Sequence, residues 1–152
     1  MRIETTRFGT LEVEEDRIIH VPEGLIGFPG DRRYVLLEHR KDSPFLWFQS
    51  LDHGTLAFVV TDPLLIMPDY EIDLNPEDMA LLNLEGKEEE LEEIRPMAIV
   101  NISKGNQKEV TVNLLGPIII YHPKKLAKQV ILYHSAYSHR HPMLLNPNEK
   151  AP

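Results

Sequence analysis

One stretch near the C-terminal end, residues 109–123, most constrains what this chain can fold into. It reads EVTVNLLGPIIIYHP, and Val110, Val112 and Leu114 alternate with intervening residues until a Gly-Pro pair interrupts the run. Alternation is typical of a half-buried strand, and the β-branched run at 118–120 is typical of a buried one. The stretch therefore predicts two consecutive β-strands separated at Gly-Pro, with no group in it that does chemistry.

The rest of the chain has the same strand-rich character. Turn residues separate short runs with strand periodicity, which predicts strands at 2–6, 10–14, 17–21, 34–39, 45–51, 56–61, 70–74, 97–103, 110–115, 117–121 and 129–133. A hairpin turn is predicted at Gly105-Asn106. One helix is predicted after Asn75, a good N-cap followed by Pro76, with Gly86 as its stop. The predicted fold class is mainly β: a small antiparallel β-barrel or sandwich with at least one short α-helix.

The length and the end of the chain predict one domain with a tail. A chain of 152 residues can bury a real core within one domain. Residues 1–133 are expected to form a single β-rich domain. Residues 134–152 contain three prolines and little apolar content, which predicts a flexible C-terminal tail.

The start of the chain and its hydropathy bear on location. Residues 1–4, MRIE, lack an apolar signal region, and no apolar run approaches the roughly 20 residues of a membrane helix. We therefore expect a cytoplasmic protein without membrane contact. There is no cysteine, which excludes disulfides and thiolate metal sites.

Charge is distributed unevenly along the chain. The net charge is −8, but residues 69–93 carry eleven acidic side chains against one basic one, a net of −10. Such a block repels phosphate and attracts basic protein surfaces. The alternative interpretation is a solvated helix and loop that only keep the protein in solution.

Motifs of catalysis and cofactor binding are missing from the sequence. Gly24, Gly27 and Gly30 are not spaced as a dinucleotide fingerprint or a P-loop, and no serine lies in a nucleophile elbow. Histidines cluster at 134–141, but a solvated tail does not fix metal ligands on rigid elements. The sequence therefore predicts a protein that is not an enzyme, with no cofactor and no metal.

One nucleic-acid alternative remains open. Lys124, Lys125 and Lys128 lie near Tyr121, Tyr133 and Tyr137 in the sequence, and lysines with aromatic rings can bind single-stranded nucleic acid. The alternative function is thus a small β-barrel single-stranded RNA-binding protein that uses the Lys124–Lys128 region. The patch is small, and the acidic block opposes it, so direct nucleic-acid binding is not the preferred prediction.

The order of motifs resembles the flagellar assembly factor FliW family over about residues 1–133. The resembling motifs, in chain order, are TRFG at 6–9, IIHV at 18–21, GLIGFP at 24–29, SPFLWFQS at 43–50, FVV at 58–60, DYEIDL at 69–74, NLLGPIII at 113–120, Lys124-Lys125, and KQVIL at 128–132. The chain departs from the family pattern at Gly116 and Tyr121, where Ala and Asn are expected.

The resemblance implies a function through binding. Members of this family bind flagellin in the cytoplasm and, when free of it, bind and antagonise CsrA, the RNA-binding repressor of flagellin translation. The charge pattern then places the CsrA contact on the acidic strand and helix start, with Tyr70 as an aromatic anchor. The predicted contact residues are Asp69, Tyr70, Glu71, Asp73, Glu77 and Asp78. The flagellin-binding residues are not assigned.

Overall fold

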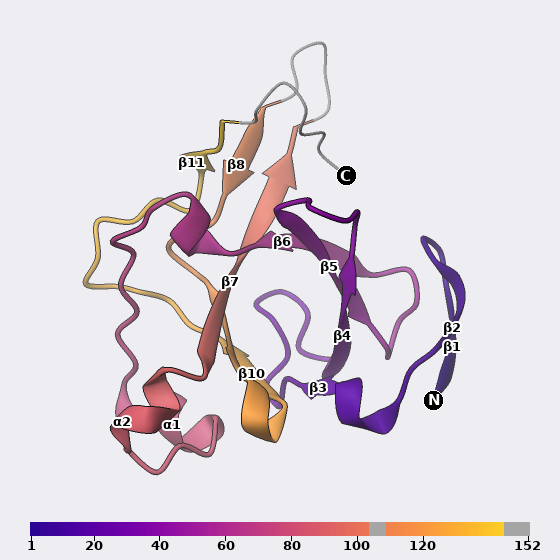
Figure 1. Ribbon diagram of the computed structural model, residues 1–152, viewed down its shortest axis with the longest axis horizontal. Coiled ribbons are helices and arrows are strands. Elements are labelled where there is room, and N and C mark those ends of the chain that lie inside the picture. Colours follow the sequence, from indigo (N-terminus) through magenta and orange to yellow (C-terminus); the bar gives the residue numbers. More distant parts are fainter. Residues whose placement is uncertain (104–108, 145–152) are drawn as a thin grey trace.

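The computed structural model describes residues 1–103 and 109–144 of the chain, and most of its regular structure is β-sheet (Figure 1). The strands are β1 (Arg2–Thr5), β2 (Gly9–Glu12), β3 (Ile19–His20), β4 (Arg33–Glu38), β5 (Phe45–Ser50), β6 (Ala57–Thr61), β7 (Ile94–Ile102), β8 (Val110–Val112), β9 (Ile118–Tyr121), β10 (Leu126–Gln129) and β11 (His141–Pro142). The α-helices are α1 (Pro76–Leu81) and α2 (Glu88–Leu91), and 3₁₀ turns lie at Glu15–Arg17, Pro63–Leu65 and His122–Lys124.

The main sheet closes on itself. Its strands follow the order β11-β8-β7-β6-β5-β4-β3-β10-β9, and β7 also pairs with β9. Strands β3 to β7 with β9 and β10 therefore form a ring, in which the β10–β3 pairing is parallel and the other described pairings are antiparallel. Closure removes exposed strand edges from the ring. The predicted fold class, a mainly β barrel-like domain with short helices, is confirmed.

Strand β7 is long enough to pair with two strands in succession. Met97 pairs with Ile118 of β9 and Val100 pairs with Val112 of β8, so residues 98–99 face residues 113–117. Residues 113–117, which include Gly116-Pro117, separate β8 from β9, so the predicted break between the two strands is confirmed. Gln129 holds it in place, because its Nε2 donates to the Gly116 carbonyl at 3.0 Å and its Oε1 accepts from the Ile26 amide at 2.8 Å.

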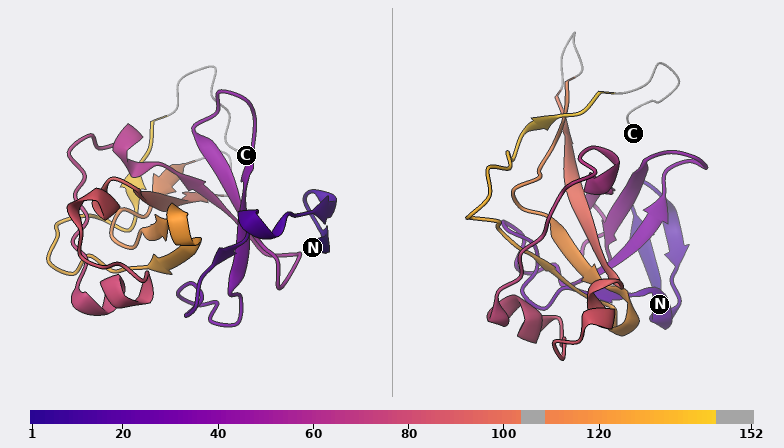
Figure 2. Two further views of the ribbon diagram at one scale, coloured as in Figure 1. Left: turned by 60° about the horizontal axis from the view of Figure 1, so that its bottom comes forward. Right: turned by 60° about the vertical axis from the view of Figure 1, so that its left-hand side comes forward.

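Three apolar clusters stabilise the fold. The ring interior is filled by side chains of the closing strands, including Tyr34 and Phe48, whose rings stack at 4.3 Å. A second cluster lies between the β7–β9 side of the ring and the segments at 66–84 and 130–143. The third lies under the β1–β2 hairpin, which stands on the side of the ring opposite α1 and α2 (Figure 2).

Several predicted elements differ from the structure. Residues 70–74 are in no strand, β8 ends at Val112, and the strand predicted at 129–133 overlaps β10 only at Gln129. The helix stop at Gly86 was wrong, since α1 ends at Leu81 and Asn83 takes a positive φ of 60°. The turn predicted at Gly105-Asn106 lies outside the described residues.

Residues beyond 133 contact the sheet where they are described. Strand β11 pairs with β8, and Tyr137 and Met143 pack against the second apolar cluster. The boundary at residue 133 and the flexibility of the tail stay predictions. Within the described ranges, no helix is both long and apolar enough to cross a membrane.

Candidate functional site

An extended segment, residues 70–75, lies at the start of the acidic block and begins at a buried tyrosine. Tyr70 is 6% exposed, its hydroxyl donates to the Leu114 carbonyl at 2.6 Å, and its ring lies 4.6 Å from that of Tyr137. Burial, and secondarily Tyr137, raises the pKa of Tyr70 above the ordinary 10.0. The neutral hydroxyl thus fixes the start of the segment to the β8–β9 connection.

Side chains of this segment alternate between core and solvent. Ile72 and Leu74 pack against the second apolar cluster, whereas Glu71 and Asp73 are exposed. The predicted alternation of faces is confirmed, but the predicted strand is not, because no strand of the described residues pairs with this segment. The two carboxylates therefore project from a backbone that packing holds in place.

Helix α1 fixes the other end of the segment through Asp78. The Asn75 side chain accepts from the Asp78 amide at 2.7 Å, and the Asp78 carboxylate accepts from the Asn75 amide at 3.2 Å, forming a capping box. Asp78 is 5% exposed and accepts from Lys128 Nζ at 2.6 Å. Lys128, on β10, thereby ties the helix start to the ring.

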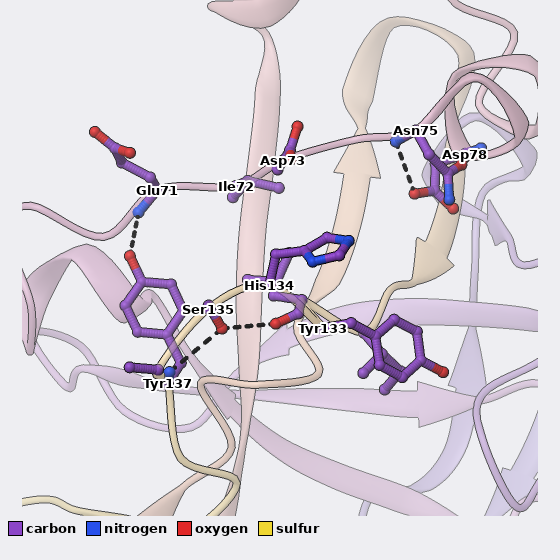
Figure 3. A pocket seen from close by; sticks show the side chains of 12 residues that line it. Glu71, Ile72, Asp73, Asn75, Asp78, Tyr133, His134, Ser135 and Tyr137 are labelled. Carbon is purple, nitrogen blue, oxygen red and sulfur yellow. Dashed lines mark hydrogen bonds between the residues drawn. The ribbon is translucent and has the colours of Figure 1, made fainter.

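A groove of about 630 Å³ separates the segment from residues 131–137 (Figure 3). Glu71, Asp73 and Asn75 lie along one wall, while Tyr133, His134 and Tyr137 lie along the other. The wall at 131–137 is held by local bonds, including Ser135 Oγ to the Leu132 carbonyl at 2.7 Å. Tyr133 is 82% exposed and offers an aromatic surface beside the groove, with its ring pointing away from Glu71 and Asp73 (Figure 3).

Four exposed acidic side chains in or beside this groove have no ion-pair partner among the described residues. None of the exposed carboxylates of Asp69, Glu71, Asp73 and Glu77 forms an ion pair with another described residue. No described cation lies within ion-pair distance of these four carboxylates, and their negative field favours a basic partner.

Helix α2 extends the negative surface and has its own internal support. Glu90 accepts from the amides of Glu85 and Lys87 at 2.9 and 2.8 Å, and these bonds lower the pKa of Glu90. The remaining glutamates of the helix region, Glu88, Glu89, Glu92 and Glu93, are exposed. The acidic block thus consists of two groups in the chain, at 69–78 and at 85–93, which the uncharged residues 79–84 separate.

The structure divides the six predicted contact residues into two groups. Asp69, Glu71, Asp73 and Glu77 are exposed. Tyr70 and Asp78 are buried and occupied by internal hydrogen bonds, so neither presents its polar group to a partner. Tyr133 was predicted only as part of the nucleic-acid alternative, and its place on the opposite wall was not predicted, because the exposure of a residue at the end of a predicted strand cannot be read from periodicity.

The lysines of the nucleic-acid alternative are largely engaged. Lys128 binds Asp78 and Lys124 Nζ donates to the Asn83 carbonyl at 2.7 Å, while Lys125 Nζ lies 3.0 Å from His122 Nε2. Tyr121 is only 6% exposed. The structure does not bring these residues together as a basic surface with stacking rings. Over residues 1–103 and 109–144, histidine and carboxylate side chains also form no group of three or more suited to a metal ion.

Comparisons with known proteins agree with the order of the motifs and with the fold. The family model described as FliW protein matches residues 2–144. The flagellar assembly factor FliW of Natranaerobius thermophilus is 40% identical, covering 99% of this chain and 97% of its own. The factor of the same name from Syntrophus aciditrophicus is 42% identical, covering 96% and 89%.

A solved structure is similar over the same extent. The crystal structure of the flagellar assembly factor FliW superposes with a TM-score of 0.83 at 30% identity, covering 97% of this chain and 99% of that one. The family model, the two relatives and the solved structure therefore each match nearly the entire chain. The chain belongs to the FliW family of flagellar assembly factors.

Proposed function

We propose that this chain acts in the cytoplasm as a protein-binding regulator of flagellar assembly, without catalysis. It binds flagellin and, when free of flagellin, binds the translational repressor CsrA and relieves repression of flagellin synthesis. The observation that carries the CsrA part is the row of uncompensated carboxylates at Asp69, Glu71, Asp73 and Glu77. An RNA-binding repressor is basic where it holds phosphates, so such a row attracts the protein and repels its RNA.

The burial of Tyr70 and Asp78 refines this proposal. Both residues position the acidic segment, and its exposed neighbours make the contact. Tyr133 supplies the aromatic surface at the groove, where a guanidinium or an apolar side chain of the partner can pack. We therefore expect the two proteins to associate rapidly, with an association rate constant that falls as the salt concentration rises.

Isothermal titration of this protein with CsrA tests the proposal. Glu71→Lys combined with Asp73→Lys should weaken binding by about 10- to 100-fold and flatten its salt dependence, because each reversal replaces an attraction by a repulsion. The matched control reverses Glu14 and Glu15, two exposed acids next to β2, and should bind as the wild type does. Equal affinities of the two double variants for CsrA would show that CsrA does not contact this segment.

A second titration tests the partner switch. CsrA is added to the protein after saturation with flagellin, and the heat of binding should then disappear. Retained CsrA binding in the presence of bound flagellin would contradict exchange between the two partners. It would not bear on the acidic contact, which the charge-reversal variants test.

A further inference from the structure

The backbone of the acidic segment offers hydrogen-bonding groups that nothing in the described chain uses. The amides of Ile72, Asp73 and Leu74 donate to no described residue, and the carbonyls of Glu71 and Asp73 accept from none. Exposed sheet edges accept added strands, and an extended segment with open backbone groups offers the same donors and acceptors. The ring strands present no comparable opening at this place, because β7 is paired on both sides.

Of these open groups, the Glu71 carbonyl and the amide and carbonyl of Asp73 face the groove, whereas the amides of Ile72 and Leu74 alternate to the other side. The Glu71 amide donates to the Tyr137 hydroxyl at 2.9 Å and the Asn75 amide donates to Asp78, and both acceptors line the groove (Figure 3). Amides two residues apart in an extended chain point to the same side. The amide and carbonyl of Asp73, midway between them, therefore point into the groove as well.

The segment is also held in the conformation that an added strand needs. It is fixed at one end by Tyr70 and at the other by the capping box of α1, and Ile72 and Leu74 anchor its inner side. Ordering the template on binding consequently costs little, which favours association.

Charge and shape define the occupant. Glu71 and Asp73 flank the open backbone and have no internal cation, so basic side chains of an incoming strand would be favoured beside them. Tyr133 on the far wall favours a guanidinium or an apolar side chain. An anionic strand or a nucleic acid would meet the same carboxylates with repulsion.

We infer that this groove binds an extended basic segment of a partner protein by strand addition to residues 71–74. The inference rests on the proposed function, since it assigns a binding mode to the same acidic site. The incoming strand donates to the Glu71 and Asp73 carbonyls and accepts from the Asp73 amide, and its lysine or arginine side chains lie beside the two carboxylates.

Two synthetic peptides test the inference on the full chain. Both consist of alternating lysine and valine, and one is N-methylated on every backbone nitrogen, which removes its donors and keeps its charge. The unmethylated peptide should bind about tenfold more tightly, because the methyl groups of the other peptide remove its donors and keep the two backbones from approaching within hydrogen-bond distance. NMR hydrogen exchange should show slowing at the Asp73 amide with that peptide alone.

Variants at one position separate backbone from charge. Asp73→Asn should weaken both peptides alike, since it removes charge and keeps the amide. Asp73→Pro removes the amide and should reduce the preference for the unmethylated peptide, with a circular dichroism spectrum confirming that the variant is folded. Equal binding of the two peptides to the wild type, or no binding of either, would overturn strand addition.

The same measurements keep the two proposals apart. If CsrA does not bind but the unmethylated peptide does so with a protected Asp73 amide, the proposed function fails and strand addition stands. If CsrA binding depends on Glu71 and Asp73 while the peptides do not differ, the proposed function stands and the site acts by charge alone.

Discussion

Replacing Lys128 by methionine should lower the free energy of unfolding by more than the loss of an exposed surface ion pair does. Lys128 Nζ lies 2.6 Å from Asp78 Oδ1 and 3.7 Å from Glu23 Oε1, and its side chain is 18% exposed. The Asp78 side chain is 8% exposed. Lys128→Met keeps the apolar stem and leaves the Asp78 carboxylate without its cation.

The expected magnitude lies between two limits. Breaking a fully buried ion pair costs about 3–5 kcal/mol, and exposed pairs contribute about 0–1 kcal/mol. Asp78 is nearly buried, but it retains the hydrogen bond from the Asn75 amide after the substitution. We expect a loss of about 2–3 kcal/mol in the free energy of unfolding, which lowers Tm by roughly 4–12 °C for a domain of this size.

Urea unfolding monitored by the fluorescence of Trp47, the single tryptophan, measures this change. The control is Lys124→Met, which removes an exposed lysine bound only to the Asn83 carbonyl and should cost less than about 1 kcal/mol. Equal losses in the two variants would refute the reasoning, because the Asp78 pair would then contribute no more than a surface contact.

The pH dependence of the same difference gives a second check. Desolvation lowers the pKa of Lys128, but the hydrogen bond and charge of Asp78 outweigh it and raise the pKa above the ordinary 10.5. A raised folded pKa contributes stability that is complete below 10.5 and is lost as the pH rises through the folded value. The excess stability of the wild type over Lys128→Met should thus be constant from neutral pH to about 10 and shrink above it. An unchanged excess at higher pH would contradict the pairing.

Two further substitutions test the positions that hold the site and its surroundings. Gly24→Ala should destabilise the fold by about 2–4 kcal/mol, because φ is +69° and the added Cβ would clash with the Phe28 carbonyl oxygen. The control is Gly27→Ala, where φ is +89° but the space is open, and it should cost only about 1 kcal/mol. Equal decreases in Tm for the two variants would exclude the clash. Tyr70→Phe should cost about 1–2 kcal/mol by leaving the Leu114 carbonyl unsatisfied. Since burial raises the pKa of Tyr70, the wild type should also lose stability above pH 10.0 faster than Tyr70→Phe does, and parallel alkaline unfolding curves would argue against that burial effect.

The sequence predicted those elements whose causes are local. The alternation and β-branching around the Gly-Pro pair correspond to β8 and β9, and Asn75 with Pro76 begins α1 as its capping chemistry requires. The acidic residues at 71 and 73 are exposed because period-2 alternation puts Ile72 and Leu74 on the apolar cluster. These features depend on residues within a few positions of one another.

Features that depend on distant residues could not be predicted. Residues 70–74 have strand alternation, yet pairing depends on whether another strand lies alongside, and sequence period does not report neighbours. Tyr70 has the polarity of an interface anchor, but its hydroxyl is bound to the Leu114 carbonyl. The position of that carbonyl depends on how β8 and β9 pair with β7, which the residues around Tyr70 do not determine. Tyr133 is exposed for a similar reason, because its exposure follows from how the chain leaves β10.

The buried members of the predicted site explain how the exposed members can act. A row of carboxylates on a mobile loop would lose part of its attraction to the entropy of ordering, whereas this row is attached between the Tyr70 hydroxyl bond and the Asp78 capping box. Lys128 pairs with Asp78, the buried carboxylate of the predicted site, whereas the exposed Glu71 and Asp73 form no ion pair with a described residue. The same division of charge that stabilises the fold therefore directs the remaining negative field toward a basic partner.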